Sequence, residues 1–425
     1  MSGVPEGVPR HRLRHPQWQL ATATLDAVLH RGAVADACLQ EAFRTHREMG
    51  SRDRALVGAL VFEVLRDLRR LQAMAGPVAD DASSLCALQA LRTGLADVET
   101  LLRLGFEGAE PCAQALERFE ETQLSAAQRD NLPDAIHAQW HVQYGETETA
   151  ALAQALRLPA PVDLRVNTLK TDRATAAAAL AQSGIEAVDT PWSPTGLRLT
   201  RRVALQSVAA FREGWIEPQD EGSQVLSRLL AASPGERIAD YCAGAGGKTL
   251  AMAATMQDRG ELWALDIDSA RLARLTPRLQ RAGVRCVQRQ GLAREGLPSD
   301  WTGGFDGILV DAPCSGTGTW RRQPDARLRL PDVAAITAVQ REILAKAAQG
   351  LRPGGRLVYG TCSLLASEND AIVDDFLQSH PAFEEADAGR ALAAQGIDLP
   401  GRRLRMLPHR HATDGFFGAL LVRRP

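Results

Sequence analysis

Residues 240–249 read DYCAGAGGKT, a glycine-rich turn between a short apolar strand and a helix. Two phosphate-binding patterns come close to this stretch. A P-loop requires its first glycine at the position of Cys242, so only the Gly-Lys-Thr end of that motif is present. A dinucleotide fingerprint requires its third glycine where Thr249 stands. Neither pattern is complete, which makes a P-loop ATPase the weakest interpretation of the chain.

A turn that binds S-adenosylmethionine is a further interpretation of the same stretch. Its glycines would let the backbone come close to the amino-acid part of that ligand. About twenty residues later, Asp266 follows the apolar run 262–265, where a carboxylate accepts hydrogen bonds from ribose hydroxyls. Since the same acid suits a nucleotide ribose, the turn alone does not decide between the two ligands.

From residue 235 onward, short apolar strands alternate with helices. This alternation predicts an α/β class with a mostly parallel, doubly wound sheet covered by helices on both faces. An extended pair near 404–408 and 415–422 would close the sheet. The elements expected before that pair are 237–241, 249–256, 261–265, 269–282, 285–289, 307–310, 333–349, 356–359 and 368–379.

Two cysteines follow strands of this expected sheet. Cys314 comes shortly after the strand 307–310, and Cys362 comes shortly after the strand 356–359. Ligands of open α/β sheets bind at the carboxyl ends of the strands, so both thiols are expected in the binding site. A Walker B acid would explain Asp311 in an ATPase, but it would leave both thiols unexplained.

Two thiols beside a methyl donor suggest methylation of a pyrimidine at carbon 5. This carbon is too weak a nucleophile to attack a sulfonium, so a thiolate must first add to carbon 6. An ordinary thiol has a pKa of about 8.5, so the site must also supply positive charge or a base. Asp311 would bind the cytosine edge at N3 and N4.

Three motifs in this order and spacing resemble the RNA cytosine-C5 methyltransferases of the Sun/Nop/RsmB family. They are the turn at 240–249, DAPCSGTG at 311–318 and GTCS at 360–363. LRVNT at 164–168 and QDEGS at 219–223 also resemble landmarks of this family. The resemblance implies a class I Rossmann-like methyltransferase domain, S-adenosyl-L-methionine as the cofactor, and RNA, expected to be rRNA, as the substrate.

The resemblance also implies roles for single residues. Cys362 would be the nucleophile, and Cys314 would assist product release. In DNA cytosine methyltransferases the cysteine of the Pro-Cys turn attacks instead, so an exchange of these roles stays open. Asp311 would contact the cofactor as well as the base. The other cofactor contacts implied by the family are Cys242, Ala243, Gly244, Ala245, Gly246, Gly247, Lys248 and Asp266.

Two departures from the family pattern affect the cofactor site. Gly244 and Ala245 replace an Ala-Pro pair, which makes the turn more flexible but keeps the later glycines and the lysine. Leu292 stands where the family has an acid near the adenine ring. A non-catalytic rRNA assembly factor with a degenerate cofactor pocket is therefore the alternative to an enzyme.

The domain organisation is expected to have three parts. Residues 1–130 read as a helical domain that loosely resembles the NusB-like RNA-binding domain, preceded by a basic arm with Arg10, Arg12 and Arg14. Residues 131–233 read as a small α+β RNA-binding module of short strands and one alanine-rich helix. Residues 234–425 form the expected methyltransferase domain.

Two arginine-rich segments are candidates for RNA contacts. The first follows the Cys314 turn, at the mouth of the expected pyrimidine site, where arginines meet phosphate. Its members are Arg321, Arg322, Arg327 and Arg329. The second comprises Arg402, Arg403, Arg405, His409, Arg410 and His411. Trp320, beside the first group, is expected to be a packing residue rather than a base-stacking platform.

Composition and charge exclude several classes of protein. The chain has 425 residues, 45% hydrophobic and 24% charged, which is typical of a globular protein of two or three domains. No apolar run reaches the roughly 18 residues of a membrane span. Seven cysteines without a C-x-x-C pair predict reduced thiols, no metal site and a cytoplasmic location. The net charge of −2 means that RNA must meet a local basic surface, and no obligate protein partner is expected.

Overall fold

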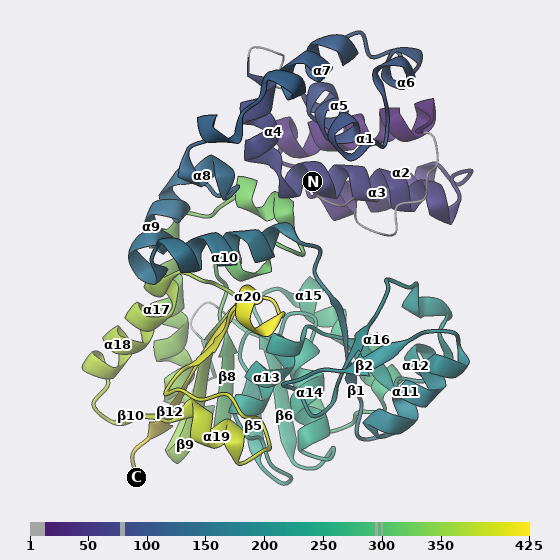
Figure 1. Ribbon diagram of the computed structural model, residues 1–425. Helices are drawn as coiled ribbons and strands as arrows, with labels where there is room; N and C mark the ends of the chain where they lie inside the picture. Colours follow the sequence, from purple (N-terminus) through teal and green to yellow (C-terminus); the bar gives the residue numbers. More distant parts are fainter. Residues whose placement is uncertain (1–12, 77–80, 294–295, 299–300) are drawn as a thin grey trace. The chain divides into compact units, whose positions relative to one another are not determined.

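The computed structural model describes residues 13–76, 81–293, 296–298 and 301–425, and the chain divides into two compact units. Unit 1 comprises Met1–Pro159 together with Trp320–Leu330, and unit 2 comprises Ala160–Thr319 and Pro331–Pro425. Each unit has its own hydrophobic core, and the helices of unit 1 and the strands of unit 2 are labelled in Figure 1. Unit 1 is therefore built from two segments that are separate in the sequence.

Unit 1 is helical. Its core is built around α5, which is buried along most of its length and packs against α1, α3, α4 and α7. A helix buried on nearly all sides needs apolar or small residues all round, as α5 has. The helices are α1 (His15–Arg31), α2 (Ala35–Thr45), α3 (Ser51–Arg66), α4 (Leu68–Ala75), α5 (Ala82–Thr93), α6 (Val98–Arg103), α7 (Ala109–Arg118), α8 (Ala126–Arg129), α9 (Asp134–Tyr144) and α10 (Glu146–Arg157).

The segment Trp320–Leu330 packs within unit 1. The Trp320 ring is fully buried and lies 5.8 Å from the ring of Trp140 in α9. Asp325, also buried, accepts a hydrogen bond from the backbone N–H of Ala35 at the start of α2. The expectation that Trp320 is a packing residue is confirmed.

A small antiparallel sheet opens unit 2. Its strand order is β2-β3-β1-β4, and α11 packs against it through Ala176 and Leu180. The strands are β1 (Val162–Val166), β2 (Ala187–Asp189), β3 (Gly196–Leu199) and β4 (Ile216–Pro218), and the helices are α11 (Arg173–Gln182) and α12 (Ala209–Arg212).

The large sheet of unit 2 has the order β10-β12-β9-β8-β5-β6-β7, with β11 paired to β12. The neighbours from β9 to β7 are parallel, whereas β10, β11 and β12 are antiparallel to their neighbours. The strands are β5 (Arg237–Asp240), β6 (Glu261–Asp266), β7 (Val287–Gly291), β8 (Phe305–Asp311), β9 (Leu351–Thr361), β10 (Phe383–Ala386), β11 (Leu404–Met406) and β12 (Phe416–Arg423).

Helices cover both faces of this sheet (Figure 1), as the alternating pattern predicts. The first face packs against α13 (Glu221–Leu229), α14 (Gly247–Thr255), α15 (Ser269–Ala273), α16 (Leu275–Ala282) and α19 (Ala388–Ala393). The second face packs against α17 (Val333–Gln349) and α18 (Asp370–Ser379). This is the doubly wound arrangement of the Rossmann-like class.

The region 131–157 differs from the expectation of short strands. It forms α9 and α10, separated by Gly145 at φ +80°. Each helix buries only two to four side chains, so its apolar periodicity is weak in the sequence. The three-part division at 130 and 233 stays a prediction, and the first strand of unit 2 begins at Val162. Of the basic arm, Arg10 and Arg12 lie outside the described residues, and Arg14 pairs with Asp53.

Candidate active site

The candidate site lies at the carboxyl ends of the parallel strands β5, β6, β8 and β9. The parallel pairing of these strands places Asp311 beside Gly360 and Asp240 beside Leu309. The glycine turn, Asp266 and the two cysteine turns therefore follow strand ends at one edge of the sheet, as the sequence predicts.

The glycine turn has a shape that needs glycine at two positions. Gly244 and Gly246 have φ values of +54° and +81°, in the left-handed region. A Cβ on Gly246 would lie 2.2 Å from a methyl carbon of Leu275, and a Cβ on Gly244 would lie 2.7 Å from the guanidinium of Arg271. The turn is thus a backbone cradle that leads into α14 and has no room for a side chain at either glycine.

Asp266 stands beside this cradle with acceptor capacity left. One carboxylate oxygen accepts the N–H of Gly244 at 2.8 Å, and the other accepts the N–H of Asp268 at 2.8 Å. A carboxylate has about four acceptor positions, so two remain for hydroxyl donors. Together with the backbone cradle, this donor and acceptor set fits S-adenosylmethionine.

The side chain of Lys248, at the end of the glycine turn, pairs with Asp311. Its Nζ lies 2.5 Å from an Asp311 oxygen and 5.6 Å from the centre of the Phe416 ring. Burial lowers the pKa of Lys248, but the nearby Asp311 outweighs this and raises it. Thr249 donates its hydroxyl to Asp240 at 2.6 Å. Both side chains that a P-loop would turn toward phosphate are thus engaged elsewhere, which argues against an ATPase.

The two thiols of the strand-end turns meet. The sulfur atoms of Cys314 and Cys362 lie 3.4 Å apart, and both residues are partly exposed. The contact with Cys362 and burial raise the pKa of Cys314 well above its ordinary value. Either sulfur atom can donate the hydrogen bond between them. Burial also raises the pKa of Cys242, which makes that thiol a poor nucleophile.

Close backbone contacts fix these turns to the loop that precedes β12. The N–H of Gly318 donates to the Cys362 carbonyl at 2.9 Å, and the N–H of Gly415 donates to the Gly318 carbonyl at 2.8 Å. A Cβ on Gly318 would lie 2.4 Å from the Gly415 oxygen. Gly318 therefore cannot carry a side chain without separating the turns.

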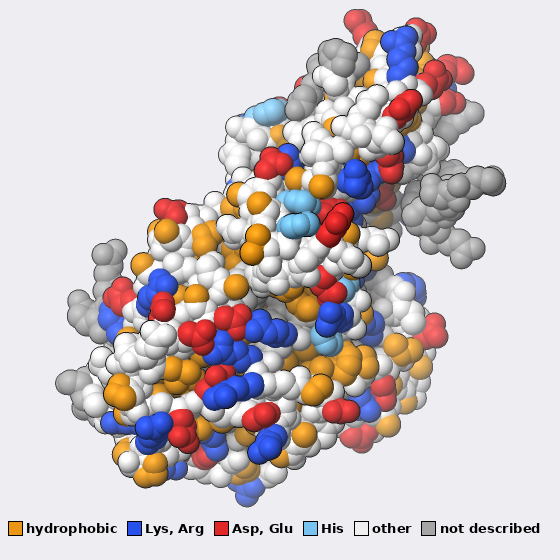
Figure 2. All heavy atoms as spheres, turned by 60° about the vertical axis from the view of Figure 1, so that its left-hand side comes forward, with side chains coloured by type: hydrophobic (Ala, Val, Ile, Leu, Met, Phe, Trp, Pro, Cys, Tyr) orange, Lys and Arg blue, Asp and Glu red, His pale blue; other side chains and the backbone are white. Residues whose placement is uncertain are grey.

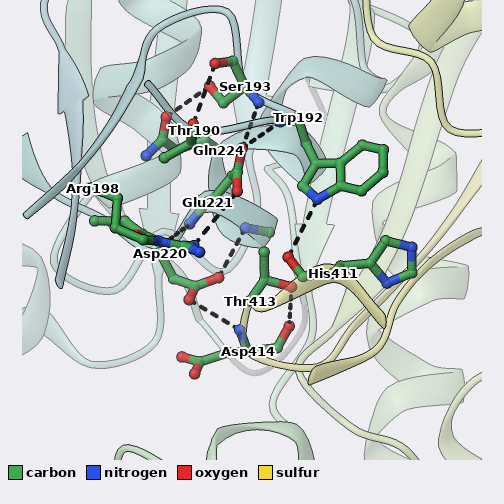
Figure 3. Close-up of polar contacts among 12 residues, drawn as sticks. Thr190, Trp192, Ser193, Arg198, Asp220, Glu221, Gln224, His411, Thr413 and Asp414 are labelled. Carbon is green, nitrogen blue, oxygen red and sulfur yellow. Dashed lines mark hydrogen bonds and ion pairs between the residues drawn. The ribbon is translucent and has the colours of Figure 1, made fainter. Parts of the chain in front are cut away.

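The QDEGS motif has a structural role at the start of α13 (Figure 3). The Glu221 carboxylate accepts the N–H groups of Trp192 and Ser193 at 2.6 and 2.8 Å. The Asp220 carboxylate accepts the N–H of Asp414 at 3.0 Å. The start of α13 thus holds two loops by hydrogen bonds. One contains Trp192 and Ser193, and the other leads from Asp414 to Phe416. The sequence identified this motif as a landmark but not its function as a clamp.

Leu292 lies directly after β7. Its N–H donates to the Asp266 carbonyl at 2.9 Å, and its partly buried side chain packs against the sheet core. It brings no acceptor atom from its side chain to this part of the site. The side chain at this position is therefore apolar, and its effect on cofactor binding stays a prediction.

The proposed phosphate contacts after Cys314 need correction. Arg321 is 7% exposed and donates to the Pro159 carbonyl, and Arg327 is 5% exposed and donates to the Asn131 carbonyl at 2.8 Å. Both belong to unit 1, and burial lowers the pKa of Arg327 to about 9. Arg322 is half-buried. Buried guanidinium groups that donate to backbone carbonyls are not available to phosphate.

Ion pairs occupy part of the second arginine-rich segment. Arg403 pairs with Asp370, Asp374 and Glu385, and Arg405 also pairs with Asp370. In the view of Figure 2, blue basic side chains lie beside red acidic ones. This segment therefore presents mixed charge to RNA and not a uniformly basic surface.

No group of three or more potential metal ligands occurs among the residues that the structure describes. In the same part of the chain, no helix has the length and apolar character needed to cross a bilayer.

Comparison with known proteins gives matches over most of the chain. The family model "16S rRNA methyltransferase RsmB/F" matches residues 227–422, and a ferredoxin-like domain model of RsmF/B-like methyltransferases matches residues 132–206. The ribosomal RNA small subunit methyltransferase B of Xanthomonas campestris is 34% identical over 402 residues, which cover 88% of this chain and 89% of that protein.

Solved structures are similar as well. The crystal structure of PH0851 covers 97% of this chain and 100% of its own, with 26% identity and a TM-score of 0.77. A methyltransferase homologue from Pyrococcus horikoshii covers 72% of this chain and 100% of its own, with 30% identity and a TM-score of 0.60.

Proposed function

Since this chain belongs to the RsmB/F family of S-adenosylmethionine-dependent 16S rRNA methyltransferases, we propose that it methylates carbon 5 of a cytosine in rRNA through a covalent cysteine adduct. The observation that carries this proposal is the pair of thiols 3.4 Å apart at the ends of β8 and β9. Methylation of a nitrogen or an oxygen needs no thiol nucleophile, whereas carbon 5 of a pyrimidine does.

Cys362 is the nucleophile in this proposal. Its thiolate forms a bond to carbon 6, and the electron pair of the ring double bond moves to carbon 5. When bound, S-adenosylmethionine supplies the methyl group that carbon 5 accepts. A water molecule then accepts the carbon 5 proton, and the electron pair of that C–H bond forms the ring double bond again. The bond between carbon 6 and sulfur breaks at the same time, which regenerates the thiolate, and Cys314 would assist this release.

The neighbours of Cys362 support this assignment. The Cys314 thiol lies 3.4 Å from the Cys362 sulfur, within reach of a hydrogen bond to it. Lys248 adds a positive charge close enough for Cys362 to act on the pKa of Lys248. A thiol donor and a cation therefore both lie near Cys362, where each can stabilise negative charge on the sulfur.

Asp311 would hold the base. Its carboxylate is 30% exposed, and one of its oxygens is paired with Lys248. The other oxygen can accept a hydrogen bond from the cytosine amino group, which fixes the base edge as charge develops on the ring. The cofactor would be held by the turn from Cys242 to Lys248 and by Asp266.

One experiment tests the proposal directly. Purified protein, S-adenosylmethionine and 30S or 16S rRNA from a strain that lacks the gene are incubated, and bisulfite sequencing reads the rRNA. We expect one new 5-methylcytosine. A methyl mark on a nitrogen or an oxygen would overturn the carbon 5 assignment. Calorimetry without detectable S-adenosylmethionine binding by folded protein would instead favour the assembly-factor alternative that Leu292 keeps open.

A further inference from the structure

We infer that Glu368 and Asn369 are positioning residues that hold the two cysteine turns in one arrangement. Glu368 acts on the turn that contains Cys314, and Asn369 acts on the turn that contains Cys362. The inference rests on the proposed covalent mechanism, because it concerns the relative placement of the two thiols.

Glu368 is a buried acid with an unusual set of partners. It ends the short helix η6 (Ala366–Glu368), is 0% exposed, and has no ion pair with any residue that the structure describes. One oxygen accepts the N–H of Ser315 at 2.8 Å and the amide of Gln340 at 3.3 Å. The other oxygen accepts the Ser315 hydroxyl at 2.5 Å. Three donors thus compensate for the burial of the carboxylate.

The carboxylate is joined to a cluster of three hydroxyl groups. Ser315, which follows Cys314, donates its hydroxyl to Glu368 at 2.5 Å. The Ser363 hydroxyl, which follows Cys362, lies 3.2 Å from the hydroxyl of Ser315 and 3.3 Å from that of Thr317. Glu368 therefore links the two cysteine turns through Ser315 and this hydroxyl cluster.

Asn369 spans the second turn by itself. Its side-chain oxygen accepts the Thr361 hydroxyl at 2.6 Å, and its side-chain nitrogen donates to the Ser363 carbonyl at 2.9 Å. Thr361 and Ser363 flank Cys362 on either side. Asn369 therefore holds the Thr361 side chain before Cys362 and the Ser363 backbone after it.

A simple helix-capping role does not account for this pair. The sequence suggests that Glu368 and Asn369 are only acid and cap residues at the start of α18. Asn369 stands at the cap position, but its side chain makes no capping hydrogen bond to α18. Both side chains turn back toward the cysteine turns.

The experiment compares Glu368→Gln, Ser315→Ala and the double variant with wild type. Glutamine keeps the size of the side chain but places a donor where Ser315 needs an acceptor. We expect kcat for rRNA methylation to fall at least tenfold in E368Q, while KM for rRNA and the calorimetric affinity for S-adenosylmethionine stay within about twofold. The double variant should be no slower than E368Q alone, because both changes break the same link.

The matched control is Glu342→Gln, which removes an exposed carboxylate from α17. It should leave kcat unchanged. Thermal melting of every variant checks that the fold is kept. Wild-type kcat in E368Q would overturn the inference.

A second readout does not depend on methylation. In the Cys362→Ala background, the pH dependence of Cys314 alkylation by iodoacetamide is measured with Glu368 and with Gln at this position. The ionisable groups that face Cys314 are Cys362, Glu368 and Tyr359. Removal of the Glu368 charge should move the midpoint of the profile to lower pH, whereas Ser315→Ala, which keeps the charge, should not.

An unmoved midpoint in E368Q would contradict a direct effect of Glu368 on Cys314. A moved midpoint together with a wild-type protein that makes no 5-methylcytosine would leave the positioning role intact and refute the proposed function.

Discussion

The sulfur atoms of Cys314 and Cys362 lie 3.4 Å apart, although 48 positions separate the two residues in the chain. The parallel neighbours β8 and β9 bring them together, because each cysteine follows the end of its strand. A hydrogen bond can form between two thiols at this distance, and the proposed mechanism gives the two residues unequal roles.

The first prediction concerns this inequality. Cys362→Ala should abolish methylation, since no thiolate is left to add to carbon 6. Cys314→Ala should leave a covalent complex of protein and RNA that migrates slowly on a denaturing gel. A gel shift found with Cys362→Ala and not with Cys314→Ala would exchange the two roles.

The second prediction concerns oxidation of the pair. A disulfide has a bond of about 2.05 Å, so closing it from 3.4 Å needs only a small movement. Treatment with diamide should join Cys314 to Cys362 and stop methylation, and dithiothreitol should restore it. Peptide mapping by mass spectrometry identifies the bond, and Cys286→Ser, which changes a thiol away from the pair, should respond like wild type.

The third prediction concerns stability and pH. Burial raises the pKa of Asp240 to about 7, above its ordinary value of 3.8. The folded chain then binds this proton more tightly than the unfolded chain does, so the contribution of Asp240 is most favourable below pH 3.8 and is lost as the pH rises through about 7. Asp240→Asn should therefore raise the melting temperature relative to wild type by more at pH 8 than at pH 5. An equal difference at both pH values would contradict the raised pKa.

The fourth prediction concerns the second entry of the chain into unit 1. Trp320→Ala removes a fully buried ring that packs against Trp140, and such substitutions cost about 3–5 kcal/mol. Denaturant unfolding should show this loss. The control Val142→Ala changes a side chain that is 88% exposed and should leave the unfolding midpoint within error of wild type.

The fifth prediction separates stability from RNA binding at Arg327. Since its guanidinium donates to a backbone carbonyl, Arg327→Gln should lower the melting temperature. The slope of log Kd for rRNA against log salt concentration should stay the same, because no phosphate contact is lost. A slope reduced by about one would restore Arg327 as a phosphate contact.

The sequence predicted the site best where residues with functional side chains or special backbone conformations directly follow strands of the sheet. The glycines at 244 and 246, Asp266 and the two cysteines follow strand ends, and an α/β sheet gathers such ends at one edge. The fold class and the composition of the site could therefore be predicted together.

Other features depend on contacts that no local pattern reveals. Arg321 and Arg327 follow Cys314 closely in the chain, yet their segment packs in unit 1, so proximity in sequence misassigned them. Glu368 resembles an ordinary acid before a helix, because its partner Ser315 lies 53 positions away. In both cases, hydrogen bonds to residues far away in the sequence determine where the side chain lies.

The double passage of the chain through unit 1 affects how this protein can be divided. Deleting the chain up to Pro159 would leave the buried Trp320 without Trp140, against which it packs. No single cut in the gene separates the helical half from the catalytic half, because the physical border crosses the chain three times. The two units are consequently expected to be expressed and purified together. A stable catalytic fragment would require a redesigned link in place of residues 320–330.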